Sequence, residues 1–204
     1  MKKALFIFLL LAGFTAVAQV RVMPGIRAGA SISTLTQTDL DYKTDFYVGT
    51  FAAIKLSRFY VLQPEVNYSR QGASGRQYYN YYYYDGNYSG DGHIDDMSLQ
   101  YLSFSIINRF TLSDRIDVHV GPTLDFLLNN TYQSIDTDAD TGITAGIGYT
   151  LPFGLTIEAR VKKGFVDILT DYYDGQGNYY DDYNTNFSFQ VGVSYNFTVS
   201  GRKN

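Results

Sequence analysis

The stretch from Phe187 to Phe197 alternates strictly between apolar and polar side chains. Its odd positions carry phenylalanine, valine and tyrosine, and its even positions carry serine, glutamine, glycine and asparagine. Successive side chains of an extended strand point to opposite faces, so this strand has one face suited to lipid and one suited to a narrow polar interior. Such a strand near the C-terminus predicts a β-barrel of the outer-membrane type.

The N-terminus has the pattern of a cleaved secretory signal. Two lysines precede an apolar run from Ala4 to Leu11, and an Ala-x-Ala cleavage site ends at Ala18. This run is short for a membrane-spanning helix, which needs about 20 apolar residues. We therefore expect a signal peptide at 1–18 and a single barrel domain at 19–204, with a tail at 199–204. The chain has no cysteine, which excludes disulfides and a lipid-modified N-terminal cysteine.

Eight segments of the chain alternate in this way and have the length of a tilted membrane strand. They run over residues 22–33, 46–56, 59–70, 98–112, 116–128, 141–151, 155–166 and 186–198. Short turns at Ser57-Arg58, Ser113-Asp114-Arg115 and Pro152-Phe153-Gly154 alternate with long loops at 34–45, 71–97, 129–140 and 167–185. The pattern predicts an all-β fold, an eight-stranded antiparallel up-and-down transmembrane barrel with long extracellular loops and short periplasmic turns.

A soluble barrel of the lipocalin type would use the same alternation with its apolar face inside. Three features argue against that inversion, and one is the alternation of short turns with long loops. The polar face is rich in small residues such as Gly25, Gly29, Ser31 and Gly146, which suit a crowded lumen better than a solvated surface. The apolar face also ends in aromatic residues near both expected membrane interfaces, as in membrane barrels. These are Tyr68, Phe165 and Phe187 at the outer interface, and Tyr60, Phe110, Tyr149, Tyr195 and Phe197 at the inner one.

The chain also resembles a known family, the PorT-type outer-membrane β-barrel proteins of the Bacteroidota, often labelled porin family proteins. The matching pieces are Gly25-Ile26-Arg27-Ala28-Gly29, Leu62-Gln63-Pro64-Glu65-Val66-Asn67-Tyr68-Ser69, Gln100-Tyr101-Leu102, Val120-Gly121-Pro122 and the last strand. The resemblance implies an outer-membrane location. Within the last strand, the residues that resemble the C-terminal signal read by the barrel assembly machinery are Gln190, Gly192, Tyr195 and Phe197. The chain departs from that signal by continuing past Phe197.

The inward face of the expected barrel carries charges of both signs. On the alternation, the inward charged residues and histidine are Arg27, Lys55, Glu65, Arg109, Asp117, His119, Asp125, Glu158, Arg160 and Lys162. An eight-stranded barrel has room for side chains but not for a wide channel. We therefore expect a lumen polar network of salt bridges and hydrogen bonds. The alternative is a narrow ion path or a small-ligand site lined by the same residues.

Catalysis in such a barrel needs a nucleophile, a base and an orienting acid within mutual reach. His119 lies one inward step from Asp117, and Ser103 or Ser105 on the neighbouring strand could reach it. A structural histidine that is hydrogen-bonded to Asp117 explains the pattern equally well. No spacing marks an active site, so we do not expect an enzyme.

The expected extracellular loops are strongly acidic and rich in tyrosine. They hold fifteen acidic residues against two basic ones, Lys43 and Arg76, and loops 71–97 and 167–185 hold twelve of the 20 tyrosines. Such a surface repels nucleic acid and favours a cationic or protein partner. Arg70 and Lys163 are expected at the outer rim, where phosphates of outer-membrane lipid and lipopolysaccharide would neutralise them.

One loop has spacing that is similar to a calcium loop of the EF-hand type. Its candidate ligands are Asp85, Asn87, Ser89, Asp91 and Asp96. The loop has no closing glutamate and its flanks are strands, and Asp, Asn and Gly are also good turn formers. No cofactor is therefore expected beyond a weak calcium site.

Together these patterns predict a non-enzymatic outer-membrane protein with a structural or surface-interaction role, carried by its acidic, tyrosine-rich loops. Two alternatives stay open, a narrow porin-like channel and an accessory component of an outer-membrane protein secretion system.

Overall fold

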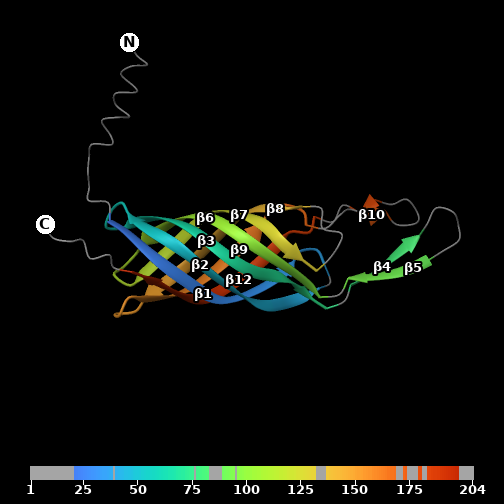
Figure 1. Ribbon diagram of the computed structural model, residues 1–204, viewed down its shortest axis with the longest axis horizontal. Coiled ribbons are helices and arrows are strands. Elements are labelled where there is room, and N and C mark those ends of the chain that lie inside the picture. The colour runs from blue at the N-terminus through green and yellow to red at the C-terminus, as the bar shows by residue number, and fades with distance from the viewer. Residues whose placement is uncertain are drawn as a thin grey trace, which may run out of the picture.

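Eight long antiparallel strands close into a barrel in the computed structural model of the chain (Figure 1). They are β1 (Arg21–Leu35), β2 (Asp41–Lys55), β3 (Tyr60–Ser74), β6 (Met97–Thr111), β7 (Ile116–Asn130), β8 (Ala139–Thr150), β9 (Leu155–Gly164) and β12 (Asn186–Asn196). The structure describes residues 21–38, 40–75, 77–82, 89–94, 96–131, 137–168, 172–173, 179–180 and 183–197. The expected signal peptide and C-terminal tail lie outside these residues. Within them, no helix is long and apolar enough to cross a membrane.

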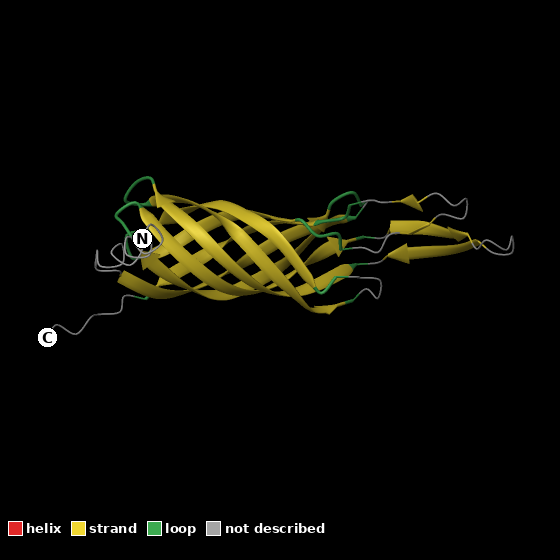
Figure 2. Cartoon of the chain, turned by 90° about the horizontal axis from the view of Figure 1, so that it is seen from above, coloured by secondary structure: helices red, strands yellow, loops and turns green. Residues whose placement is uncertain are grey.

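The strand order confirms the predicted up-and-down barrel. Each barrel strand pairs with its neighbours in the chain, and β12 closes the sheet by pairing with β1. Connections of four residues, at 56–59, 112–115 and 151–154, lie at the end where β1 begins and β12 ends. We call this the turn end. The other end, where β1 ends and β2 begins, is the loop end (Figure 2).

Serine side chains build two of the three tight turns. The Ser57 hydroxyl accepts the backbone N–H of Tyr60 at 3.1 Å, and the Ser113 hydroxyl accepts that of Ile116 at 3.2 Å. The third turn instead has Gly154 at φ 91°, in the left-handed region that glycine tolerates best. Local turn chemistry therefore fixes the pairing of β2–β3, β6–β7 and β8–β9.

The strands reach further toward the loop end than the alternation predicted. Strand β2 begins at Asp41, five residues before the predicted start, because its register with β3 shifts between Tyr42 and Tyr47. Such a bulge inserts an extra residue and breaks the period of two that marks a strand in the sequence. The segments read as loops also contain two hairpins. These are β4 (Gln77–Tyr82) with β5 (Ser89–Ile94), and β10 (Tyr172–Tyr173) with β11 (Tyr179–Tyr180).

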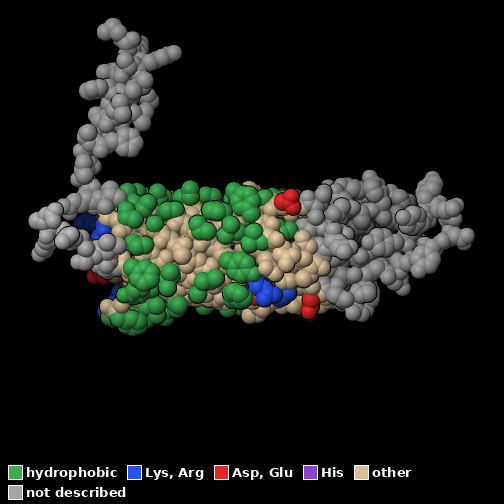
Figure 3. All heavy atoms as spheres, in the orientation of Figure 1, with side chains coloured by type: hydrophobic (Ala, Val, Ile, Leu, Met, Phe, Trp, Pro, Cys, Tyr) green, Lys and Arg blue, Asp and Glu red, His purple; other side chains and the backbone are tan. Residues whose placement is uncertain are grey.

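The outward face of the barrel is an apolar belt (Figure 3). Large side chains such as Ile26, Phe104 and Ile147 are about half exposed on it. Near the turn end, aromatic rings pack pairwise, with ring centroids 5.4 Å apart for Tyr60–Phe110 and 5.5 Å apart for Tyr195–Phe197. Soluble proteins rarely expose so much contiguous apolar surface, so the belt fits lipid.

Glycines on the inward face make room for an aromatic side chain. Gly29 of β1 pairs with Gly192 of β12 and, on its other side, with Tyr47 of β2. A Cβ on Gly29 would lie 2.9 Å from the Tyr47 ring, and a Cβ on Gly192 would overlap the Tyr47 hydroxyl. The two glycines therefore form a flat floor on which Tyr47 lies across the lumen.

Replacing Gly192 with valine should destabilise the barrel by about 1–3 kcal/mol, because the added side chain displaces Tyr47 in a packed interior. The measurement is the unfolding free energy of the refolded barrel in urea. Ala28→Val is the matched control, since it adds the same side chain type on the outward face of the paired strand. Equal stability of the two variants would contradict the described packing of Tyr47.

Candidate functional site

Four charged side chains form a closed ring across the middle of the lumen. Arg27 of β1 contacts Glu65 at 2.7 Å and Glu158 at 2.6 Å. Arg160 of β9 contacts the same two carboxylates at 2.8 and 3.2 Å. Each charge therefore has two partners of opposite sign. All four side chains are at most 4% exposed, so this central ring lies in a low-dielectric interior, where such contacts are strong.

Neutral side chains add hydrogen bonds to the central ring. Gln63 donates to Glu65 at 2.7 Å, and Asn67 donates to the same carboxylate at 3.3 Å. The Tyr47 hydroxyl donates to Glu158 at 3.3 Å, and the Arg27 guanidinium lies 4.7 Å from the centre of the Tyr47 ring. Such added hydrogen bonds help to offset the cost of burying the two carboxylates.

A second polar layer lies nearer the turn end. Arg109 makes a two-pronged contact with Asp117, at 3.1 Å through Nε and 2.7 Å through Nη2. The same carboxylate contacts Nδ1 of His119 at 3.1 Å. Arg109 also donates to Gln63 at 2.8 Å. Gln63 therefore joins this layer to the central ring.

A third pair lies on the loop side of the central ring. Lys162 contacts Asp125 at 2.5 Å, and Thr123 donates to the same carboxylate at 3.1 Å. The cavity that Arg27, Arg160 and Lys162 help to line measures about 20 Å³, close to the minimum that holds one water molecule. At this level the lumen is therefore almost filled by its own side chains.

An apolar cluster closes the lumen at the loop end. Its buried members are Leu35, Leu40, Ala73, Met97, Leu99, Tyr101 and Ile168, with Leu127 packed against them. Leu40 and Ile168 come from the connections after β1 and β9, and the rest come from barrel strands. We call this cluster the loop-end plug. Ions entering from this end would have to cross it before reaching the charged layers.

Hydrogen bonds hold the connecting segments over the plug. The backbone N–H of Thr36 donates to the carbonyl of Thr185 at 3.0 Å, and the N–H of Ile168 donates to that of Asn184 at 2.9 Å. At Gly72, where φ is 138°, the Ser33 hydroxyl bonds both the N–H and the carbonyl. The plug is thus a bonded part of the fold.

The structure places nine of the ten residues expected on the inward face in these layers. The tenth is Lys55. Lys55 is exposed instead, at the turn end of the barrel, where it is the last residue of β2. A second correction concerns Asp140, which lies in strand β8 and not in the expected acidic loop 129–140. It is 1% exposed and accepts the backbone N–H groups of Phe165 and Val166 at 3.2 and 3.0 Å.

The side chains needed for nucleophilic catalysis are not brought together at His119. Ser105 bonds Thr123 at 3.1 Å, and Ser103 accepts from Lys162 at 3.4 Å. His119 instead packs its Nε2 against Gly146, where a Cβ would lie 2.6 Å away. It therefore has the surroundings of a structural histidine.

The predicted calcium loop falls partly outside the described residues. Asp85 and Asn87 lie there, whereas Ser89 and Asp91 fall within strand β5. Asp96 accepts the backbone N–H of Gly75 at 2.8 Å. Among the residues that the structure describes, no group of three or more His, Asp or Glu side chains could hold a metal ion. The calcium site stays a prediction.

The residues of the proposed assembly signal lie on both faces of β12. Gln190 and Gly192 face the lumen, and the rings of Tyr195 and Phe197 face outward. The N–H of Phe197 donates to the carbonyl of Pro24 at 2.7 Å, which ties the end of the last strand to the start of the first. Recognition of these residues by an assembly machine stays a prediction.

Comparison with known proteins agrees with this architecture. The family described as outer membrane protein beta-barrel domain matches residues 17–170. No curated protein matches the chain. Among solved structures, Neisserial surface protein A is 14% identical with a TM-score of 0.54, over 85% of this chain and 97% of that one. OprG from Pseudomonas aeruginosa is 10% identical with a TM-score of 0.48, over 88% and 98%. The likeness to the Neisserial protein shows the fold alone.

Replacing Glu65 with alanine should destabilise the barrel by about 3–5 kcal/mol, because it leaves Arg27 and Arg160 buried with one carboxylate between them. The measurement is again urea unfolding of the refolded protein. The rim pair of Arg70 and Asp45, at 3.3 Å with Arg70 38% exposed, supplies the control. Asp45→Ala should cost about 1 kcal/mol or less. A Glu65→Ala barrel as stable as the control would contradict a buried ring.

Proposed function

This chain belongs to the outer membrane protein beta-barrel domain family and lies in the outer membrane. From that premise we propose that it is a closed, non-enzymatic barrel that acts as a structural or surface-interaction protein. The observation that carries the proposal is the doubly closed lumen. A loop-end plug and a charged ring lie in series along the bore, so the described interior offers neither a water-filled path nor an assembled catalytic site.

The interaction surface is proposed to be the loop end. Two hairpins, β4–β5 and β10–β11, extend from this end of the barrel (Figure 1). The connections there carry most of the acidic residues and most of the tyrosines of the chain. Tyrosine supplies rigid contact area with a polar tip, and acidic groups attract cationic partners. A cationic protein surface is therefore the proposed partner, and nucleic acid is not.

Lipid contacts are proposed for the rim just below these loops. Arg70 lies over the Phe46 ring at 6.0 Å and is more than one-third exposed. Lys163 also faces outward from β9 and donates to Thr36 at 3.4 Å. Cations at this height would meet the phosphate groups of lipopolysaccharide or phospholipid. This placement supports an orientation with the loop end at the cell surface.

The finer family assignment is also a proposal. The sequence pieces around Gly25, Pro64 and Pro122 support a PorT-type barrel of the Bacteroidota, and the N-terminal pattern supports a cleaved signal peptide. A role in protein secretion is the corresponding alternative. Loss of secreted proteins after deletion of the gene, with restoration by the wild-type chain, would favour it over a passive surface role.

Single-channel recording in a planar bilayer tests the closed lumen. The refolded wild type should be silent, because both barriers are intact. A variant with Leu40→Ala and Ile168→Ala should also stay silent, because the central ring remains. Joining these changes to serine at Arg27, Glu65, Glu158 and Arg160 should produce current, since the plug has then lost the two side chains that come from the connections and the ring has lost its charges. The four-serine variant alone, with the plug intact, is the matched control and should be silent.

Steady current through the folded wild type would overturn the proposal and favour the narrow porin-like channel. The residues of the central ring would then be candidates for the pore lining. Folding of each variant is checked first, by the circular dichroism of its strands, so that silence from a misfolded sample is not counted.

A further inference from the structure

Three of the chain's four prolines lie in barrel strands, at Pro24, Pro64 and Pro122. Proline has no backbone N–H, and within sheets it is normally confined to edges, strand starts and bulges. A closed barrel has no edge strand, so each of these prolines removes a donor from a ladder. All three side chains face outward, into the apolar belt.

The three prolines lie in one row that runs across the strands. Pro24 is opposite Ala52, and Pro64 is opposite Ile106. Pro122 follows on β7, opposite Ile143 on its other side. Continuing the β6–β7 register places Pro122 beside Ile106, so Ile106 lies between two prolines.

The ladders are interrupted where this row crosses them. Between β2 and β3, Phe51 pairs with Glu65 and Ile54 with Leu62, but Ala52 and Pro64 do not pair, in strands whose residues are all described. Between β6 and β7 the pairing stops at Ser105–Thr123 and resumes at Asn108–Val120. The second gap contains Ile106 and Pro122.

At the gap beside Pro122, the carbonyl of Ile106 lacks the backbone N–H that residue 122 would normally donate. A Cβ on Gly121 would overlap the carbonyl oxygen of Ile106, so this oxygen points toward β7 at the place where residue 122 would donate. Proline cannot donate there. An unsatisfied backbone carbonyl is costly in a bilayer, because lipid offers no hydrogen bond in exchange. By the same pairing rule, Pro64 leaves the carbonyl of Ala52 without a donor.

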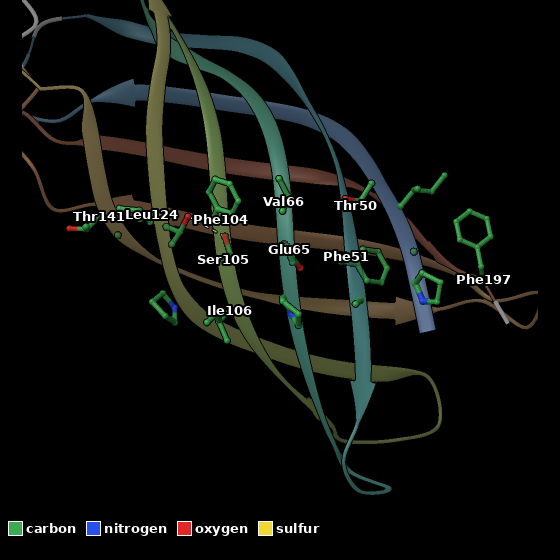
Figure 4. A pocket seen from close by; sticks show the side chains of 18 of the residues that line it. Thr50, Phe51, Glu65, Val66, Phe104, Ser105, Ile106, Leu124, Thr141 and Phe197 are labelled. Carbon is green, nitrogen blue, oxygen red and sulfur yellow. Dashed lines mark hydrogen bonds between the residues drawn. The ribbon is translucent and has the colours of Figure 1, made fainter. Parts of the chain in front are cut away.

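An apolar furrow of about 1140 Å³ follows the proline row on the outside of the barrel. Pro24, Ala52, Pro64, Ile106 and Pro122 all line it, and larger side chains such as Phe104 and Leu124 flank them. Figure 4 shows the lining residues spread across the strands from Thr141 on β8 to Phe197 beyond β12. The carbonyls without donors therefore lie along an apolar groove in the membrane.

We propose that this furrow binds an acyl chain of an outer-membrane lipid that carries a hydroxyl group. The furrow belongs to the part of the barrel that faces hydrocarbon, so its occupant is a lipid chain. The carbonyls of Ala52 and Ile106 need a donor, and a hydroxyl on that chain supplies one without bringing a charge into the bilayer. This site is independent of the proposed surface role and lies on the opposite side of the barrel wall from the closed lumen.

Native mass spectrometry of the refolded mature chain in detergent tests the site with two matched probes. The probes are 3-hydroxytetradecanoic acid and tetradecanoic acid, supplied together at equal concentration. The wild type should retain roughly two- to tenfold more of the hydroxylated chain, the range that one neutral hydrogen bond provides. Equal retention of the two probes, or retention of neither, would overturn the proposal.

Proline variants separate this site from general lipid adhesion. Pro122→Ala restores a donor to Ile106, and Pro64→Ala restores one to Ala52, so each should reduce the preference and the double variant should lose most of it. Pro152→Ala is the control, because Pro152 lies in a tight turn outside the furrow. A double variant that keeps the full preference, or a control that loses it, would show that the gaps do not select the ligand.

Discussion

The narrow bore of an eight-stranded barrel is the constraint on which this structure depends. Every second side chain of a barrel strand points into the lumen, and in an eight-stranded barrel these side chains are enough to fill it. Any charge sent inward must find its partner there, because little water can enter. Arg27, Glu65, Glu158 and Arg160 meet this condition by contacting each other in a ring. The glycines beneath Tyr47 leave space for its ring beside these charges. The amide of Gln63 supplies a hydrogen bond to Glu65.

The two faces of the wall carry opposite kinds of polar group. Inside, charged side chains are paired almost completely, so the lumen is closed and stable. Outside, proline removes backbone N–H donors, and the β2–β3 and β6–β7 registers are interrupted at Pro64 and Pro122. Outer-membrane barrels face lipid over most of their area. Chemistry that distinguishes one such barrel from another can therefore lie on the lipid side as well as in the loops.

Period-two alternation was sufficient to predict the strand number, the pairing order and the inward charges, because each depends on local spacing alone. It was not sufficient where geometry departs from that period. The bulge before Tyr47 breaks the alternation, so the predicted start of β2 was too late. Lys55 is at an inward position of the alternation, but it is exposed at the end of the strand. Part of the loop-end plug could have been predicted from the sequence, since Leu35, Leu99 and Tyr101 are apolar residues at inward positions. Leu40 and Ile168 could not have been predicted in this way, because they lie in connections, where side chains do not alternate between two faces.

The central ring also bears on how the chain must assemble. Arg27 and Glu158 are separated by 131 positions in the chain, and they meet only when the first strand and the ninth element lie on the same closed wall. Until closure, Arg27 can contact only Glu65 and Glu158 can contact only Arg160, so each charge lacks one of its two partners and needs water around it. The nascent barrel must therefore keep a hydrated interior until its last strand pairs. Expulsion of that water, rather than contact with lipid, would then be the final step of its insertion.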